Sequence, residues 1–115
     1  MDFWGRLESI ISTSRMVIDR PAGSRHPRYP SIEYPINYGF LEGVGSSDGG
    51  DLDVWRGTAS SPDLVGIVCT SDSLKQDSEV KLLLGCTDDE VDAVERFHTN
   101  EYMSCIVVRR PERKT

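Results

Sequence analysis

Residues 34–53, YPINYGFLEGVGSSDGGDLD, predict a strand, a glycine-rich loop and the start of a second strand. The loop and the second strand carry three aspartates, Asp48, Asp51 and Asp53. Oxygen ligands this close together suit hard dications such as Mg²⁺ or Mn²⁺, which complete their coordination with water and substrate phosphate. Phosphate chemistry is therefore the first hypothesis for this stretch. The alternative is that aspartate and glycine are present because they favour turns.

On either side of this stretch, short segments rich in β-branched or alternating apolar residues predict further strands. These segments are residues 16–18, 51–56, 64–71, 80–84 and 103–109, with turns at residues 57–62 and 71–78. Prolines at positions 21, 27 and 30 keep residues 22–30 extended or turning, because proline fixes φ and lacks a donor. Many short strands around few helices predict a mainly β fold, a small barrel with helices packed outside it.

Two helices are expected. Residues 2–12 place apolar side chains at helical spacing behind Asp2, a candidate N-cap. The apolar face of this helix either packs on the body of the protein or forms a dimer contact, so a homo-oligomer stays open. Residues 87–98 begin with a capping box, Thr87 and Glu90, followed by an apolar stripe. Residues 111–115 are expected to be a flexible tail.

Length and composition limit the class of protein. At 115 residues the chain is expected to be a single domain, residues 1–115. We expect a soluble cytoplasmic protein, because no apolar run is long enough for a bilayer and the N-terminus lacks a signal-peptide pattern. The cysteines, Cys69, Cys86 and Cys105, are odd in number and lack metal-site spacing, which favours reduced thiols. The net charge of −6 argues against a nucleic-acid partner.

The order of several short motifs resembles the metal-dependent inorganic pyrophosphatases of family I. The motifs are VIDRP at residues 17–21, YPINYG at 34–39, DGGDLDV at 48–54 and VGI at 65–67, followed by Asp72 and Asp77. The resemblance covers about residues 16–84. It implies an OB-like five-stranded β-barrel with an acidic site at one mouth. It also implies Mg²⁺-dependent hydrolysis of inorganic diphosphate to two phosphates by a metal-activated water, with Mn²⁺ as an alternative ion.

Carried over by position, the resemblance assigns site residues. The metal ligands would be Asp48, Asp53, Asp72 and Asp77, with Asp19 more peripheral. Tyr38 and Tyr102 would bind phosphate oxygens, and so would Lys81 and either Arg25 or Arg28. Independently, Asp48 with Asp53 and Asp72 with Asp77 have the same separation. If the strands they flank are neighbours, four carboxylates meet at one end of a barrel and require cations.

The chain also departs from the family pattern. The middle aspartate of the signature, which acts as the base, falls on Gly50, while Asp51 follows it. Either Asp51 or a water would then be the base, and turnover would be slow, since general-base assistance is typically worth about 10²–10⁴-fold. A hairpin between residues 28 and 34 and much of the C-terminal helical region are missing. Two alternatives follow: a metal- and phosphate-binding module without turnover, and a hydrolase of a larger diphosphate such as a nucleotide or polyphosphate.

Overall fold

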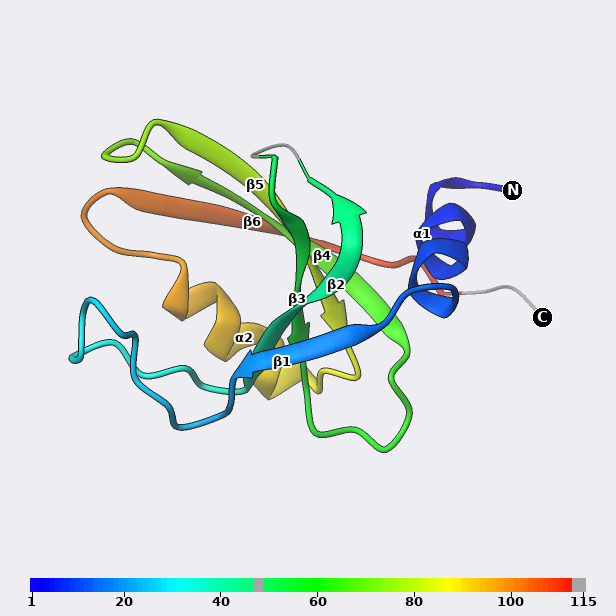
Figure 1. The fold of residues 1–115 in the computed structure, drawn as a ribbon, viewed down its shortest axis with the longest axis horizontal. Helices are drawn as coiled ribbons and strands as arrows, with labels where there is room; N and C mark the ends of the chain where they lie inside the picture. The colour runs from blue at the N-terminus through cyan, green and yellow to red at the C-terminus, as the bar shows by residue number, and fades with distance from the viewer. Residues whose placement is uncertain (47–48, 113–115) are drawn as a thin grey trace.

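The computed structural model describes residues 1–46 and 49–112, and in it the chain is mainly β (Figure 1). In chain order the elements are α1 (Phe3–Ser12), β1 (Met16–Arg20), β2 (Asn37–Gly45), β3 (Asp51–Arg56), β4 (Leu64–Asp72), β5 (Asp77–Leu84), α2 (Asp88–Phe97) and β6 (Met103–Arg109). All the predicted strand segments and both helices are confirmed. The predicted strand at residues 80–84 begins earlier, at Asp77, because its pairing with β4 continues to the turn.

The strands form one six-stranded sheet in the order β1-β2-β3-β5-β4-β6. The β3–β5 pair is parallel and the other neighbours are antiparallel. Within the described ranges no pairing joins β1 to β6, so the sheet is open, and it has six strands where the resemblance implied five in a closed barrel. The reason is topological. β1 extends the sheet on the far side of β2 and β6 extends it on the far side of β4, which leaves these two strands at opposite edges.

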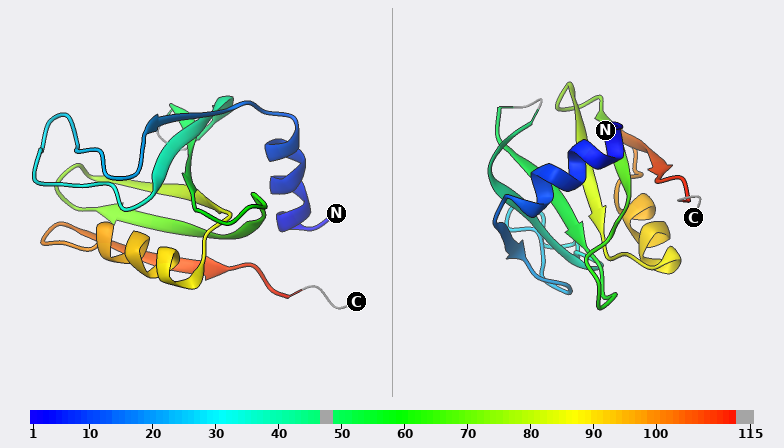
Figure 2. Two further views of the ribbon diagram at one scale, coloured as in Figure 1. Left: turned by 90° about the horizontal axis from the view of Figure 1, so that it is seen from below. Right: turned by 90° about the vertical axis from the view of Figure 1, so that its right-hand side faces the viewer.

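The sheet buries apolar side chains on both faces. Alternation along β3 and β5 sends Trp55 and Leu83 into one core and Val54 and Leu82 into the other. The first core contains side chains of α2 and of the segment before β2, and the second is covered by α1. Figure 2 shows α1 across the end of the curved sheet and α2 alongside β6. A central strand buried on both faces explains the uninterrupted Leu82–Leu84 run.

The N-terminal helix packs on the body of the protein, one of the two outcomes expected for it. Asp2 is its N-cap, with a side-chain oxygen accepting a hydrogen bond from Gly5 N at 2.8 Å. Trp4, Leu7 and Ile11 pack against the second core, while Phe3 remains 56% exposed. Neither α1 nor α2, the helices found in the described part, is long and apolar enough to cross a bilayer.

The second helix begins with the predicted capping box. The Thr87 side chain accepts from the backbone N–H of Glu90, and the Glu90 carboxylate accepts from that of Thr87. Glu90 also accepts from Thr58 N in the loop after β3. The cap therefore fixes both the start of α2 and its position against the sheet.

The glycine of the NYG motif is required because the backbones of β1 and β2 approach each other closely at this position. A Cβ on Gly39 would lie 1.8 Å from the carbonyl oxygen of Val17, on the paired strand β1. Only glycine allows so close an approach. The motif thus has a structural role in seating β1, and this role also fixes the position of the neighbouring Tyr38.

Candidate functional site

The candidate site lies where β3 and β5 separate. These two strands are in register from Val54–Leu82 to Arg56–Leu84, although they extend back to Asp51 and Asp77. Beyond the paired segment they diverge, as Figure 1 shows. Asp53 and Lys81 are the residues immediately before it, and their side chains meet at the point of separation.

Four side chains form a connected group, which we call the Lys81 cluster: Tyr38, Asp53, Glu79 and Lys81. The Tyr38 hydroxyl donates to Asp53 Oδ2 at 2.6 Å. Lys81 Nζ donates to Tyr38 Oη at 2.7 Å and to Asp53 Oδ2 and Glu79 Oε2 at 2.9 Å each. Lys81 is only 5% exposed, so its charge is balanced by these partners rather than by water. Three strands, β2, β3 and β5, supply the group.

The protonation of the Lys81 cluster follows from its burial and charges. Burial raises the pKa of Tyr38 further than the nearby Lys81 lowers it, so the phenol stays neutral and can donate. For Lys81, burial alone would lower the pKa, but the interactions with Tyr38 and Asp53 outweigh it and raise the pKa. Because Tyr38 is neutral, we assign this effect to the Asp53 carboxylate. The cluster therefore holds a fixed ammonium beside a carboxylate and a phenol.

The second predicted acidic pair lies at the β4–β5 turn. Asp72 and Asp77 are opposite each other in the ladder, the last pair before the turn. Asp72 Oδ1 accepts the N–H groups of Leu74 and Lys75 at 2.9 and 3.0 Å, so this aspartate does shape the turn. Alternation along β5 places Asp77 on the same face as Glu79 and Lys81. This acidic pair therefore shares a sheet face with the Lys81 cluster but stands nearer the tip of the hairpin.

Three other acidic residues were predicted. Asp48 lies outside the described residues. Asp51 is exposed at the start of β3 and accepts a hydrogen bond from Gly43 N at 3.2 Å. It is two residues before Asp53, so regular alternation puts both on one face of the strand. Asp19, on β1, is exposed.

The predicted phosphate-binding side chains differ in how they are engaged. Arg25 Nη1 donates to the carbonyl of Pro30 at 3.0 Å, and Nη2 lies 3.7 Å from Glu33, so Arg25 holds its own loop together. Arg28 has no such partner among the described residues. Tyr102 is 47% exposed, and its carbonyl accepts from Ser73 N, which ties it to the β4–β5 turn.

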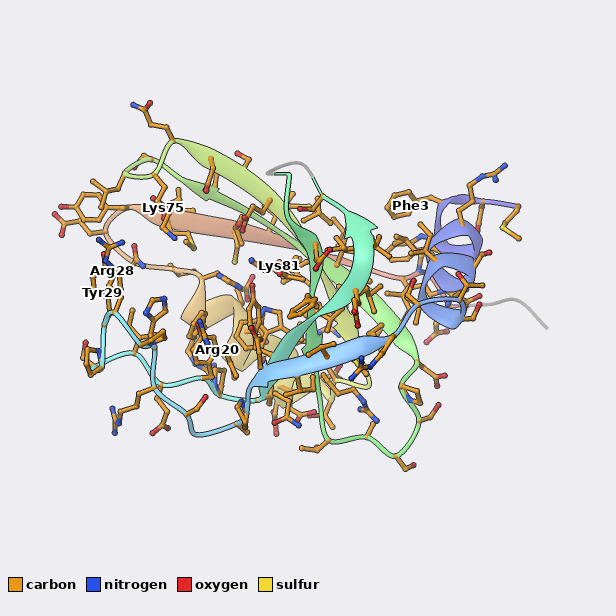
Figure 3. All side chains as sticks on the ribbon, viewed as in Figure 1. Phe3, Arg20, Arg28, Tyr29, Lys75 and Lys81 are labelled. Carbon is orange, nitrogen blue, oxygen red and sulfur yellow. The ribbon has the colours of Figure 1, made fainter. Side chains whose placement is uncertain are left out.

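Two cations that the sequence did not single out as site residues face the same region. Arg20 ends β1 and Lys75 lies in the β4–β5 turn, and Figure 3 shows both on the side of the molecule where Lys81 and Arg28 lie. Arg20 belongs to the basic segment that precedes NYG, which was a usable signal. Lys75 had none, because only the folding of the hairpin brings it near that segment.

Trp55, on β3, is fully buried. Its Nε1 donates to His98 Nε2 at 3.1 Å, so neutral His98 carries its proton on Nδ1. That Nδ1 is buried without a partner in the described structure. Burial, together with the charge of Lys81, lowers the pKa of His98 to about 3. The Trp55 ring packs edge-on against Tyr38 at 4.6 Å between ring centroids, so this pair supports the site through Tyr38.

The acidic residues suit a metal ion that is bound by one or two carboxylates, and they do not form a complete set of protein ligands among the described residues. In the described part of the chain, no three His, Cys, Asp or Glu side chains come together to hold an ion. Asp53 Oδ1 and Asp77 have no hydrogen-bond partner among those residues and are hard oxygen donors. Magnesium is often held by one or two carboxylates together with water and substrate phosphates. The donors present suit that type of binding.

Comparisons with protein families, with curated proteins and with solved structures find no match for this chain. The described geometry defines a class of site: an acidic and basic cluster at the divergence of two parallel strands.

Proposed function

We propose that the protein hydrolyses inorganic diphosphate to two phosphates in a Mg²⁺-dependent reaction. The observation that carries the proposal is the Lys81 cluster. Tyr38, Asp53 and Lys81 were each selected from the sequence as site residues, and they lie within 2.6–2.9 Å of one another. Three residues from three strands meet at one point, on the sheet face that also carries the acidic pair at the β4–β5 turn. The OB-like arrangement of the strands and a cytoplasmic location with reduced cysteines belong to the same proposal.

Asp53 beside Lys81, and Asp72 with Asp77 nearer the hairpin tip, are the described residues that would hold magnesium, with one or two carboxylates to an ion. Asp48 precedes them in sequence and would be a further ligand. When bound, Mg²⁺ lowers the pKa of a coordinated water and neutralises charge on the phosphate oxygens. Lys81 now balances Asp53 and is positioned to donate to a phosphate oxygen when that carboxylate binds a cation. Neutral Tyr38 would then donate a second hydrogen bond to the same phosphate group. Arg28, with a planar guanidinium, would bind a phosphate through two parallel hydrogen bonds.

The proton of the attacking water needs an acceptor. Asp51 is exposed, lies on the face of Asp53 and is the described carboxylate nearest in sequence to the missing middle aspartate. We assign the base role to Asp51, with solvent water as the alternative. Its present contact is a 3.2 Å hydrogen bond from Gly43, which is weak enough to exchange.

The first test is phosphate release from diphosphate, measured with Mg²⁺ and with EDTA. Asp53→Asn keeps the shape of the side chain but removes a charge, and we expect its kcat/KM to fall by about 100-fold or more. Glu42→Gln removes a carboxylate that pairs with Arg15 on the exposed part of β2, so it is the matched control. Turnover without Mg²⁺, or equal losses in both variants, would rule out the proposal.

A second experiment separates the base from the metal ligands. Asp51→Asn should lower kcat by about 10²–10⁴-fold with little change in KM if Asp51 accepts the proton. An unchanged kcat assigns that role to water.

A second candidate function is a binding module that holds phosphate without turnover. The specific observation in its favour is that Lys81 already neutralises Asp53, so the cluster is stable without a metal. Such a protein would bind diphosphate in calorimetry and release no phosphate with Mg²⁺ or Mn²⁺.

A further inference from the structure

Three cationic side chains from three different segments have no hydrogen-bond or ion-pair partner among the described residues. Arg20 is at the end of β1, Arg28 is in the loop between β1 and β2, and Lys75 is in the β4–β5 turn. Other cations nearby are paired: Arg25 with Glu33, and Lys81 with Asp53 and Glu79. In a chain of net charge −6, unpaired cations that gather in one region are available for an anion.

His26 lies close enough to all three cations for each of them to lower its pKa. Its Nδ1 accepts the N–H groups of Arg28 and Tyr29 at 3.1 and 3.2 Å, and its ring stacks on Tyr34. The loop is therefore fixed around an unprotonated imidazole. Burial lowers the pKa of His26, and Arg20, Lys75 and Arg28 each lower it further.

The figures agree with this arrangement. Figure 3 shows Arg28 and Lys75 towards one end of the molecule, with Arg20 and Lys81 nearer its middle. Figure 1 shows the loop of residues 21–36 and the tip of the β4–β5 hairpin at the same end of the molecule. The loop and the hairpin tip thus bring Arg28 and Lys75 to one end of the molecule, farther out than Lys81.

We propose that Arg20 and Lys75 bind an additional phosphate group beyond the one that Arg28 binds, so that the preferred ligand is a linear triphosphate, either free or carried by a nucleoside. One end of the chain lies at the Lys81 cluster and the other lies among the three cations. This inference rests on the proposed function only for the position of the reacting end. Hydrolysis of one anhydride bond of a free triphosphate would consume one water and give orthophosphate and diphosphate.

A diphosphate has too few phosphoryl groups to contact all four cations, Lys81, Arg28, Arg20 and Lys75. Lys81 and Arg28 already provide donors for two phosphoryl groups, and Arg20 and Lys75 would be left without an anion. A triphosphate brings further negative charge to them. Phosphate contacts from arginine and lysine are charge-assisted and are stronger than neutral hydrogen bonds.

The test is calorimetric binding in EDTA, with orthophosphate, diphosphate, tripolyphosphate and ATP as separate probes. We expect tripolyphosphate to bind about tenfold or more tightly than diphosphate, the effect of one charged hydrogen bond. Arg20→Gln and Lys75→Gln should each weaken tripolyphosphate by about tenfold. Arg15→Gln removes the same charge beside α1, where Arg15 pairs with Glu42, and should change neither affinity.

Proton NMR of His26 gives a second readout. A triphosphate that neutralises the three cations should raise the pKa of His26 in the native chain and leave it unchanged in the Arg20→Gln, Lys75→Gln double variant. Interference from His98 is not expected, because burial lowers the pKa of His98 to about 3. The same spectra show that the variants are folded.

Equal affinity for diphosphate and tripolyphosphate, or losses no larger than in Arg15→Gln, would overturn the inference. A preference for ATP over tripolyphosphate that depends on Arg20 and Lys75 supports it and identifies the nucleoside form. Failure of the proposed function looks different. Triphosphate would then bind through Arg20 and Lys75 while no Mg²⁺-dependent phosphate release occurs from diphosphate.

Discussion

Replacing Lys81 by methionine tests how much the buried cation contributes to stability. Methionine has nearly the same length, so the change removes the charge without opening a large cavity. It leaves the Asp53 and Glu79 carboxylates beside each other without their shared cation. Removing one partner of a buried ion pair typically costs about 3–5 kcal/mol.

The magnitude is set by how well water can replace the amine. The Asp53 and Glu79 side chains are 29% and 22% exposed, so they are partly solvated in the variant. We therefore expect the lower end of that range, about 3 kcal/mol of unfolding free energy at pH 7. Because the folded pKa of Lys81 is raised, its contribution is fully present below the unfolded pKa and is lost only as pH rises through the folded value. The destabilisation should thus be constant from pH 7 to about 9.

Urea denaturation followed by fluorescence of the two tryptophans measures this quantity. Arg15→Met is the matched control, because Arg15 pairs with Glu42 at an exposed site, and its expected cost is below about 1 kcal/mol. The double variant Lys81→Met, Asp53→Asn should lose about 1–2 kcal/mol less than the sum of the single losses, because one member of an unpaired cluster is then neutral. A Lys81→Met loss no larger than that of Arg15→Met would refute the reasoning.

Three further predictions concern the structural support of the site. The lowered pKa of His98 means that the unfolded chain binds its proton first, so stability is lost as pH falls below about 6.5. The loss of unfolding free energy between pH 7.5 and 5 should be about 2 kcal/mol smaller in His98→Gln, measured by urea titration. Gly39→Ala should prevent folding or cost more than about 3 kcal/mol, whereas Gly45→Ala, with open space at its Cβ, should cost less than about 1 kcal/mol in the same assay. Burial raises the pKa of the Cys86 thiol to about 11, so iodoacetamide at pH 8 should alkylate Cys69 and Cys105 well before Cys86, as read by peptide mass spectrometry; equal rates would contradict this.

Much of the local structure followed from residue pattern alone. The capping box of Thr87 and Glu90, the N-cap Asp2 and the strand segments are decided by interactions within a few residues, so the sequence was sufficient to predict them. The turn at residues 71–78 was also predicted, and Asp72 shapes it locally by accepting N–H groups two and three residues ahead.

Long-range pairing was less accessible. The resemblance implied five strands in a closed barrel, and the described strands form an open sheet of six. Closure depends on whether edge strands meet, which is a property of the twist and length of the whole sheet. No local pattern in β1 or β6 encodes it.

For the candidate site, the sequence determined which residue types are present and the spacing of Asp53, Asp72 and Asp77 along the chain. The sequence also placed Tyr38 next to Gly39, the glycine that the close approach of β1 and β2 requires. Only the tertiary structure decided that Lys81 would be buried against Asp53, since β3 and β5 are neighbours through a parallel pairing across an intervening strand. It likewise brought Lys75 near His26 and Arg28, although nearly fifty residues separate them. The physical reason is that charge partners are selected by distance in space, whereas local hydrogen bonding alone can be inferred from distance along the chain.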